Sequence, residues 1–271
     1  MRKTAILLLL TLGITTTFSQ ENKNDLPEYT GDNFSLEGAL ALFKKANSLE
    51  EFEKLINDEN NNVNNLDLNN DGETDYIVVQ DIQEKDIHII VLSTYLNENE
   101  KQDIATIGIE KTGNEEAMLQ IEGDSELYAE NTIVEPFEVV EKIEKSKGGP
   151  NIPEITTTRI IVNVWFWPSV RFLYAPSYVV WVSPHRWGFY PRWWKPWRPY
   201  NFSIFHGKGS IYRVNYHRTP TRRVIAAHKT YSPKRSKSTV VVHNRKGTTV
   251  VRKNKTGKTT VVKTKRRSAR R

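Results

Sequence analysis

A nine-residue loop in the first half of the chain carries oxygen-bearing side chains at regular spacing. Its sequence is DLNNDGETD, residues 67–75, and Gly72 stands at the sixth position, where the chain must turn sharply. Ca²⁺ takes six to eight oxygen ligands, and oxygens at this spacing fold around one point. We therefore predict a structural Ca²⁺ site, with side-chain oxygens from four residues and the backbone carbonyl of a fifth: Asp67, Asn69, Asp71 and Asp75, and Glu73.

The loop departs from an EF-hand because Val78 stands where a bidentate Glu is expected, and because a strand pattern follows. Residues 67–79 resemble instead the calcium loop of the FG-GAP and integrin-propeller repeats. A propeller needs several copies and the chain has one, so this resemblance implies a loop and not a fold. The missing ligand predicts weak, roughly millimolar affinity. The alternative is an Asx-rich turn that holds no metal.

A second group of residues that could bind a ligand is a cluster of Trp, Arg and Pro. All seven Trp lie between Trp165 and Trp197, and residues 192–198 read RWWKPWR. This stretch resembles the Trp/Arg/Pro-rich cationic host-defence peptides in composition. Indole rings favour the headgroup level of a bilayer, and Arg presents a fork of donors to phosphate. The predicted residues for binding an anionic ligand are Arg186, Trp187, Arg192, Trp193, Trp194, Lys195, Trp197 and Arg198.

Three alternatives stay open for this cluster. Its rings can stack on sugar faces or on nucleic-acid bases. They can also fill a small second core, with Arg stacked on them through cation–π contacts. Prolines at 184, 191, 196 and 199 exclude a regular helix or a central strand in any of these cases.

No enzyme motif is complete. Gly257-Lys258-Thr259 imitates the end of a P-loop, but the upstream Gly position holds Arg252. Gly123-Asp124-Ser125 is similar to the nucleophile block of GDSL-type esterases, which need a later Asp-x-x-His that the chain lacks. The His residues have no local metal-ligand spacing, although an adventitious Zn²⁺ or Cu²⁺ site stays an alternative. We predict a protein that is not an enzyme, with an unrecognised hydrolase as the alternative.

The N-terminal 19 residues have the pattern of a secretory signal peptide. Arg2 and Lys3 precede an apolar run at 5–14, and small residues Thr17 and Ser19 precede Gln20. The apolar run is too short to span a membrane, and no later segment looks transmembrane. The chain has no Cys, which excludes disulfides, Cys-based metal sites and the lipoprotein route. We expect an exported protein in the periplasm, on the outer surface or outside the cell.

Residues 20–148 are expected to form an acidic α+β domain. Ser35 can cap a helix over 36–46, and Ser48 with Glu51 forms a capping box for the next helix. Four β-branched or aromatic runs follow at 76–81, 87–96, 104–110 and 117–122. Their short connections favour an antiparallel meander, with the two helices packed on one face.

Residues 149–157 are predicted as a linker, and 158–206 as a Pro/Trp-rich segment with strands at 156–167 and 178–183. Residues 207–271 are predicted to be a largely disordered basic tail. Three similar Thr/Val units near 239, 248 and 259 offer the alternative of a three-stranded ribbon.

The two halves of the chain carry opposite charge. Residues 21–150 hold ten Lys and Arg against 31 Asp and Glu, whereas residues 151–271 hold 27 Lys and Arg against Glu154 alone. Such asymmetry indicates an interaction surface. The basic half either binds an anionic partner or folds against the acidic half.

The layout as a whole resembles a group of uncharacterised exported bacterial proteins. They share the signal peptide, an Asp-rich loop running into DYIVV, a segment like residues 120–124 and a Trp/Pro/Arg-rich block. The resemblance implies no activity. We expect an envelope protein whose basic half binds anionic polysaccharide, lipopolysaccharide or a membrane surface, with extracellular nucleic acid as another partner. Self-association of acidic domains with the basic tails of neighbouring copies is the alternative.

Overall fold

The computed structural model describes residues 25–144, 154–234, 240–244, 247–253 and 259–265. The predicted signal peptide therefore lies outside the described residues, as does part of the predicted linker. The structure confirms an α+β fold built on an antiparallel meander with a few short helices.

Two helices open the acidic domain where the sequence predicts them. α1 spans Leu36–Lys45 and α2 spans Leu49–Ile56, between short 3-10 turns at Thr30–Asn33 (η1) and Glu59–Asn61 (η2). The Ser35 hydroxyl accepts the Gly38 amide at 3.0 Å, and the Ser48 hydroxyl accepts the Glu51 amide at 3.1 Å. Each serine thus satisfies one of the free amides at a helix start. The Glu51 carboxylate accepts the amide of Asn47, one residue earlier than a capping box requires.

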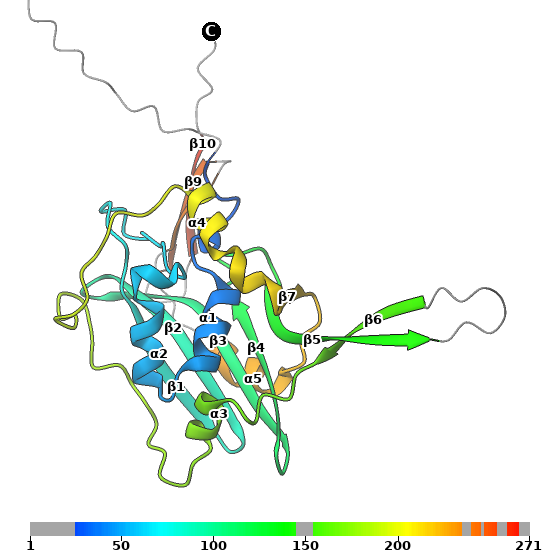
Figure 1. The fold of residues 1–271 in the computed structure, drawn as a ribbon. Coiled ribbons are helices and arrows are strands. Elements are labelled where there is room, and N and C mark those ends of the chain that lie inside the picture. The colour runs from blue at the N-terminus through cyan, green and yellow to red at the C-terminus, as the bar shows by residue number, and fades with distance from the viewer. Residues whose placement is uncertain (1–24, 145–153, 235–239, 245–246, 254–258, 266–271) are drawn as a thin grey trace, which may run out of the picture.

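The meander consists of strands in sequence order. They are β1 (Ile77–Glu84), β2 (Ile87–Asn97), β3 (Glu100–Gly113), β4 (Glu116–Gly123), β5 (Ile133–Glu144) and β6 (Glu154–Ile161), each antiparallel to the next. The first four match the predicted strands, with longer ends. β6 begins inside the predicted linker, and it pairs with the C-terminal half of β5 to form an arm that extends from the body in Figure 1.

One face of the sheet packs on α1, α2 and a third helix, α3 (Pro168–Leu173) (Figure 1). The rings of Phe43 and Phe52 meet edge to face, with centroids 5.2 Å apart, and both are fully buried. Opposite them lie the apolar side chains of the strands, such as Ile90, Leu92 and Ile107. Burial of each such side chain contributes roughly 1.5–3 kcal/mol, so this layer is the main source of stability.

Residues 202–234 pack around the domain: the first half lies beside α1 and η1, and the second half covers the other face of the sheet. This segment forms α4 (Phe202–Lys208), η3 (Gly209–Val214), β7 (Tyr216–Thr219), α5 (Ile225–Tyr231) and η4 (Ser232–Lys234). β7 pairs with the N-terminal half of β5, and Val224 and Ala227 pack on Ile89 and Val91. The prediction of disorder from residue 207 is therefore wrong for residues 207–234. Their few apolar side chains find partners on the acidic domain, which the sequence of the tail alone does not reveal.

Beyond residue 239 the described backbone follows the ribbon alternative. β8 (Val240–Asn244), β9 (Gly247–Lys253) and β10 (Thr259–Lys265) form a three-stranded antiparallel sheet in the order β10-β9-β8. The three Thr/Val units are its strands.

The Pro/Trp-rich segment contains less strand than predicted. β6 ends at Ile161, and α3 follows shortly after. Residues 178–183 do not form a regular strand, but Val182 bridges Gln80 on β1, and the Ser183 amide donates to the Val79 carbonyl at 3.0 Å. Pro184 then ends the pairing, because proline lacks an amide hydrogen.

Candidate functional site

The Trp/Arg/Pro segment is hydrogen-bonded along one side of the acidic domain. The Ser183 hydroxyl donates to Glu53 of α2 at 2.8 Å. The Thr74 amide donates to the Trp197 carbonyl at 2.8 Å, and the Tyr200 amide donates to the Asn65 side chain at 2.7 Å. Residues 183–200 therefore form a single irregular layer over α2 and the predicted calcium loop.

Tyr76 is the aromatic centre of this layer. Its buried ring lies 5.0 Å from the Trp194 ring and 6.4 Å from the Trp193 ring, measured between centroids. Trp187, Trp194 and Trp197 are half-buried, whereas Trp193 is 47% exposed. The second-core alternative thus describes part of the cluster, and Trp193 presents a ring to solvent.

The predicted cations of this layer point outward. Arg186, Arg192, Lys195 and Arg198 are all exposed, and none forms an ion pair with a carboxylate of the described residues. The Arg186 guanidinium lies 4.6 Å from the Phe189 ring centroid. Charges that are exposed and lack a protein counter-ion stay available to an anionic ligand.

Three arginines between residues 218 and 223 form ion pairs. Arg223 pairs with Glu135 at 3.1 Å, and Arg218 pairs with Asp32 at 3.3 Å and Glu37 at 3.4 Å. Part of the basic half therefore neutralises the acidic half of the same chain.

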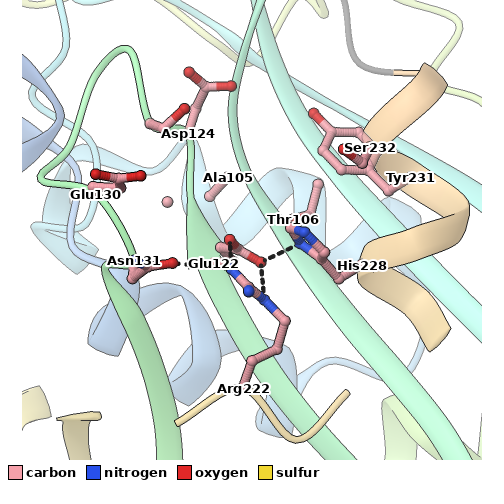
Figure 2. Close-up of a pocket in the computed structure, with 12 residues that line it drawn as sticks. Ala105, Thr106, Glu122, Asp124, Glu130, Asn131, Arg222, His228, Tyr231 and Ser232 are labelled. Atoms are coloured by element: carbon pink, nitrogen blue, oxygen red, sulfur yellow. Dashed lines mark hydrogen bonds and ion pairs between the residues drawn. The ribbon is translucent and has the colours of Figure 1, made fainter. Parts of the chain in front are cut away.

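A cavity of about 290 Å³ lies where this basic segment meets the sheet (Figure 2). Glu122 of β4 stands at its centre, and it accepts hydrogen bonds from Arg222 Nε at 3.2 Å and from His228 Nδ1 at 2.9 Å. Asp124 and Glu130 lie on another side of the cavity. Sequence reasoning missed this site because His228 and Glu122 are 106 positions apart, and neither belongs to a local motif.

Two carboxylates of this cavity, those of Glu122 and Asp124, hold the fold together. Glu122 joins β4 to both Arg222 and α5, and Asp124 accepts the Glu126 amide at 2.9 Å to fix a turn. At the far side the Tyr231 hydroxyl donates to Asp103 at 2.8 Å. Glu122 thus connects β4 to α5.

The Asp-rich loop has the sharp turn that its sequence predicts. Asn70 and Gly72 adopt left-handed φ values of 63° and 87°. Asp67 accepts the amides of Asp71 at 3.1 Å and Gly72 at 3.0 Å, and Asp71 accepts the Glu73 amide at 2.8 Å. Asn69 shares the Asp71 amide. The loop is thus held by the same side chains that are predicted to bind Ca²⁺.

Acidic side chains are crowded in this loop. Burial, with repulsion from Asp67 and Asp71, raises the pKa of Asp75 to about 8. The Asp75 carboxylate accepts the Leu68 amide at 2.6 Å. Within the part of the chain that the structure describes, no three Asp, Glu or His side chains are grouped as metal ligands. The loop therefore has donors of the right chemical type, but they do not converge, and calcium binding stays a prediction.

Comparison with models of protein families, with curated proteins and with solved structures found no match to this chain. Over the described residues, no helix combines the length and the apolar character needed to cross a membrane.

Proposed function

We propose that this chain is a non-catalytic, exported envelope protein that binds an anionic polymer or headgroup through residues 192–198. The observation that carries the proposal is the exposure of Arg192, Lys195 and Arg198 without a described carboxylate partner, beside the half-exposed ring of Trp193. Export is inferred from the pattern of residues 1–19.

The acidic domain acts as the scaffold in this proposal. Hydrogen bonds donated by the amides of Thr74 and Tyr200 hold the segment in an irregular path. The Pro-rich chain is therefore held in place without forming a strand or a helix. A preorganised cationic surface loses less conformational entropy on binding than a flexible peptide of the same composition.

Salt-dependent binding tests this proposal. The protein is added to vesicles bearing lipopolysaccharide at low and high salt. Each neutralised phosphate steepens the salt dependence, so affinity should fall sharply as salt rises. The triple variant R192Q/K195Q/R198Q should lose most of this affinity. A matched control, K45Q/K85Q/R171Q, removes the same charge from exposed positions elsewhere and should bind nearly as well as the wild type.

Two outcomes would overturn the proposal: no binding at low salt, or equal losses in the two triple variants. Nucleic acid is tested in the same assay with single-stranded DNA in place of vesicles. Self-association through basic tails gains no particular support, because Arg218, Arg222 and Arg223 already contact carboxylates of their own chain.

We also propose that residues 67–75 take up Ca²⁺. The proposal is supported by the oxygen donors of Asp67, Asn69, Asp71 and Asp75. A bound cation would favour the ionised form of Asp75, whose pKa burial and the neighbouring Asp67 and Asp71 raise to about 8. The ion would fix the connection between α2 and β1 and the Trp segment fastened to it at Thr74.

A further inference from the structure

A second cavity, of about 270 Å³, lies between α2 and the Trp/Arg/Pro segment. α2 contributes carboxylates from Glu50, Glu51 and Glu53, and the facing layer contributes the rings of Trp181 and Trp193. Acidic groups on one wall and aromatic rings on the other are the two features that attract an organic cation.

Glu53 forms the inner acidic wall. Its side chain is almost fully buried and accepts hydrogen bonds from Tyr76 Oη at 2.9 Å, Ser183 Oγ at 2.8 Å and the Val79 amide at 2.8 Å. Burial raises its pKa to about 6, so the carboxyl is still mostly ionised at neutral pH. Glu50 is exposed and Glu51 is half-buried, which places further negative charge toward the mouth.

The aromatic wall already accommodates a cation of this chain. The ammonium of Lys54 lies 5.8 Å from the centroid of the Trp193 ring, within the range of a cation–π contact. Since Lys54 and Trp193 both line the cavity, a ligand ammonium entering it would approach the same ring. Lys54 is therefore a competitor that a ligand must displace.

The cationic segment adjoins this wall. Arg192 and Trp194 flank Trp193 in the chain, and consecutive Cα atoms are about 3.8 Å apart. The carboxylates of the cavity attract an ammonium group, and Arg192 and Lys195 beside it attract a phosphate. A ligand with both charges satisfies the two surfaces together.

We propose that this cavity receives the ammonium of a zwitterionic amino-phosphate, whose phosphate lies on the exposed cations of residues 192–198. The phosphate half of this inference rests on the proposed function, and the ammonium half rests on the cavity. The shared chemistry is phosphoethanolamine, either as a lipid headgroup or as a substituent of a glycan.

Calorimetry on the full chain tests the ammonium half with soluble probes. Phosphoethanolamine should bind roughly tenfold more tightly than either ethanolamine or inorganic phosphate, because the binding free energies of its ammonium and phosphate groups add. Trp193→Leu and Glu50→Gln should each weaken ethanolamine binding severalfold. Glu98→Gln, which removes an exposed carboxylate from the turn between β2 and β3, should leave it unchanged.

Lys54→Ala gives a test that loss of folding cannot imitate. Removal of the competing ammonium should strengthen ethanolamine binding severalfold, whereas a damaged cavity would weaken it. Vesicles of phosphatidylglycerol with and without phosphatidylethanolamine distinguish the sources. A gain from phosphatidylethanolamine indicates a lipid headgroup, and binding of the soluble probe without that gain indicates a glycan substituent.

The inference fails if ethanolamine does not bind, if Trp193→Leu and Glu50→Gln leave its affinity unchanged, or if Lys54→Ala weakens it. Salt-dependent binding of phosphatidylglycerol vesicles without any ethanolamine binding would retain the proposed function and remove only the ammonium site. Ethanolamine binding without vesicle or phosphate binding would retain the cavity and remove the proposed function.

Discussion

At the scale of single residues, Glu53 connects three parts of the molecule. It belongs to α2, accepts a bond from the β1 backbone at Val79, and accepts further bonds from Tyr76 and from Ser183 of the Trp/Arg/Pro segment. One buried carboxylate thereby joins a helix, the sheet and the outer layer. The sequence of α2 does not indicate that Glu53 is buried, because Glu in the first two turns of a helix is usually solvated.

The raised pKa of Glu53 predicts a specific dependence of stability on pH. Between the ordinary value of 4.5 and the folded value of about 6, the folded chain keeps a proton that the unfolded chain has released. Rising pH therefore favours unfolding within this window and has no further effect through Glu53 above it. The cost is about 2 kcal/mol in free energy of unfolding.

Urea unfolding of the wild type and Glu53→Gln at pH 4.5 and pH 6.5 measures this cost. The wild type should lose more stability than the variant over the interval, since contributions from all other groups cancel in the comparison. Glu53→Gln should also be less stable at pH 4.5, because its amide nitrogen meets donors. Equal losses in the two chains would show that Glu53 titrates normally.

The calcium loop gives a second prediction at this scale. Titration of the wild type with Ca²⁺ should release or absorb heat, with a roughly millimolar dissociation constant. Asp71→Ala should weaken binding at least severalfold, since it removes a ligand and one of the carboxylates that accept backbone amides in the loop. Identical heats in the two proteins, or no heat in either, would refute the site.

At the scale of elements, the close approach of α5 to the sheet depends on Gly108 of β3. A Cβ atom added there would lie 2.9 Å from Ala227 Cβ and 3.0 Å from Val224 Cγ2. Both neighbours are buried and belong to the segment that covers the second face of the sheet. A larger residue would push the helix away from Ile89 and Val91.

We predict that Gly108→Ala destabilises the protein by about 1–3 kcal/mol, the usual cost of overpacking. The measurement is the midpoint of urea unfolding. Gly207→Ala in α4 is the control, because a Cβ there meets nothing within 4 Å, and it should be neutral or slightly stabilising. A neutral Gly108→Ala would indicate that α5 is more loosely placed than its contacts imply.

At the scale of the whole molecule, the two oppositely charged halves are partly one structure. The segment from β7 to α5 adds a strand to the sheet and neutralises Glu122 and Glu135, while residues 192–198 keep their cations exposed. The modest net charge of +7 therefore combines arginines that pair with carboxylates of the same chain and arginines that stay exposed.

Truncated chains test whether the segment from β7 to α5 stabilises the sheet. A chain that ends at residue 206 lacks β7 and α5, which exposes Ile89 and Val91 and leaves Glu122 without its partners. It should unfold at a clearly lower temperature than the full chain and aggregate more readily. A chain that ends at residue 234 keeps these elements and should melt close to the full chain. Equal melting of all three would mean that the basic segment does not stabilise the sheet.

The sequence by itself determined the local elements of this protein. Ser35 and Ser48 marked the helix starts, runs of β-branched or aromatic residues marked the first four strands, and the spacing of residues 67–75 marked the sharp turn at Gly72. These features depend on interactions between residues close in sequence, so their patterns can be read along the chain.

Only the tertiary structure decided which charges are free. Arg222 and Arg198 look alike in sequence, yet one contacts Glu122, 100 positions away, and the other faces solvent. The same holds for Glu53 and Glu50, three positions apart on α2, of which one is buried under Ser183 and the other is exposed. Ion pairing and desolvation depend on distance in space, and long-range contacts set those distances.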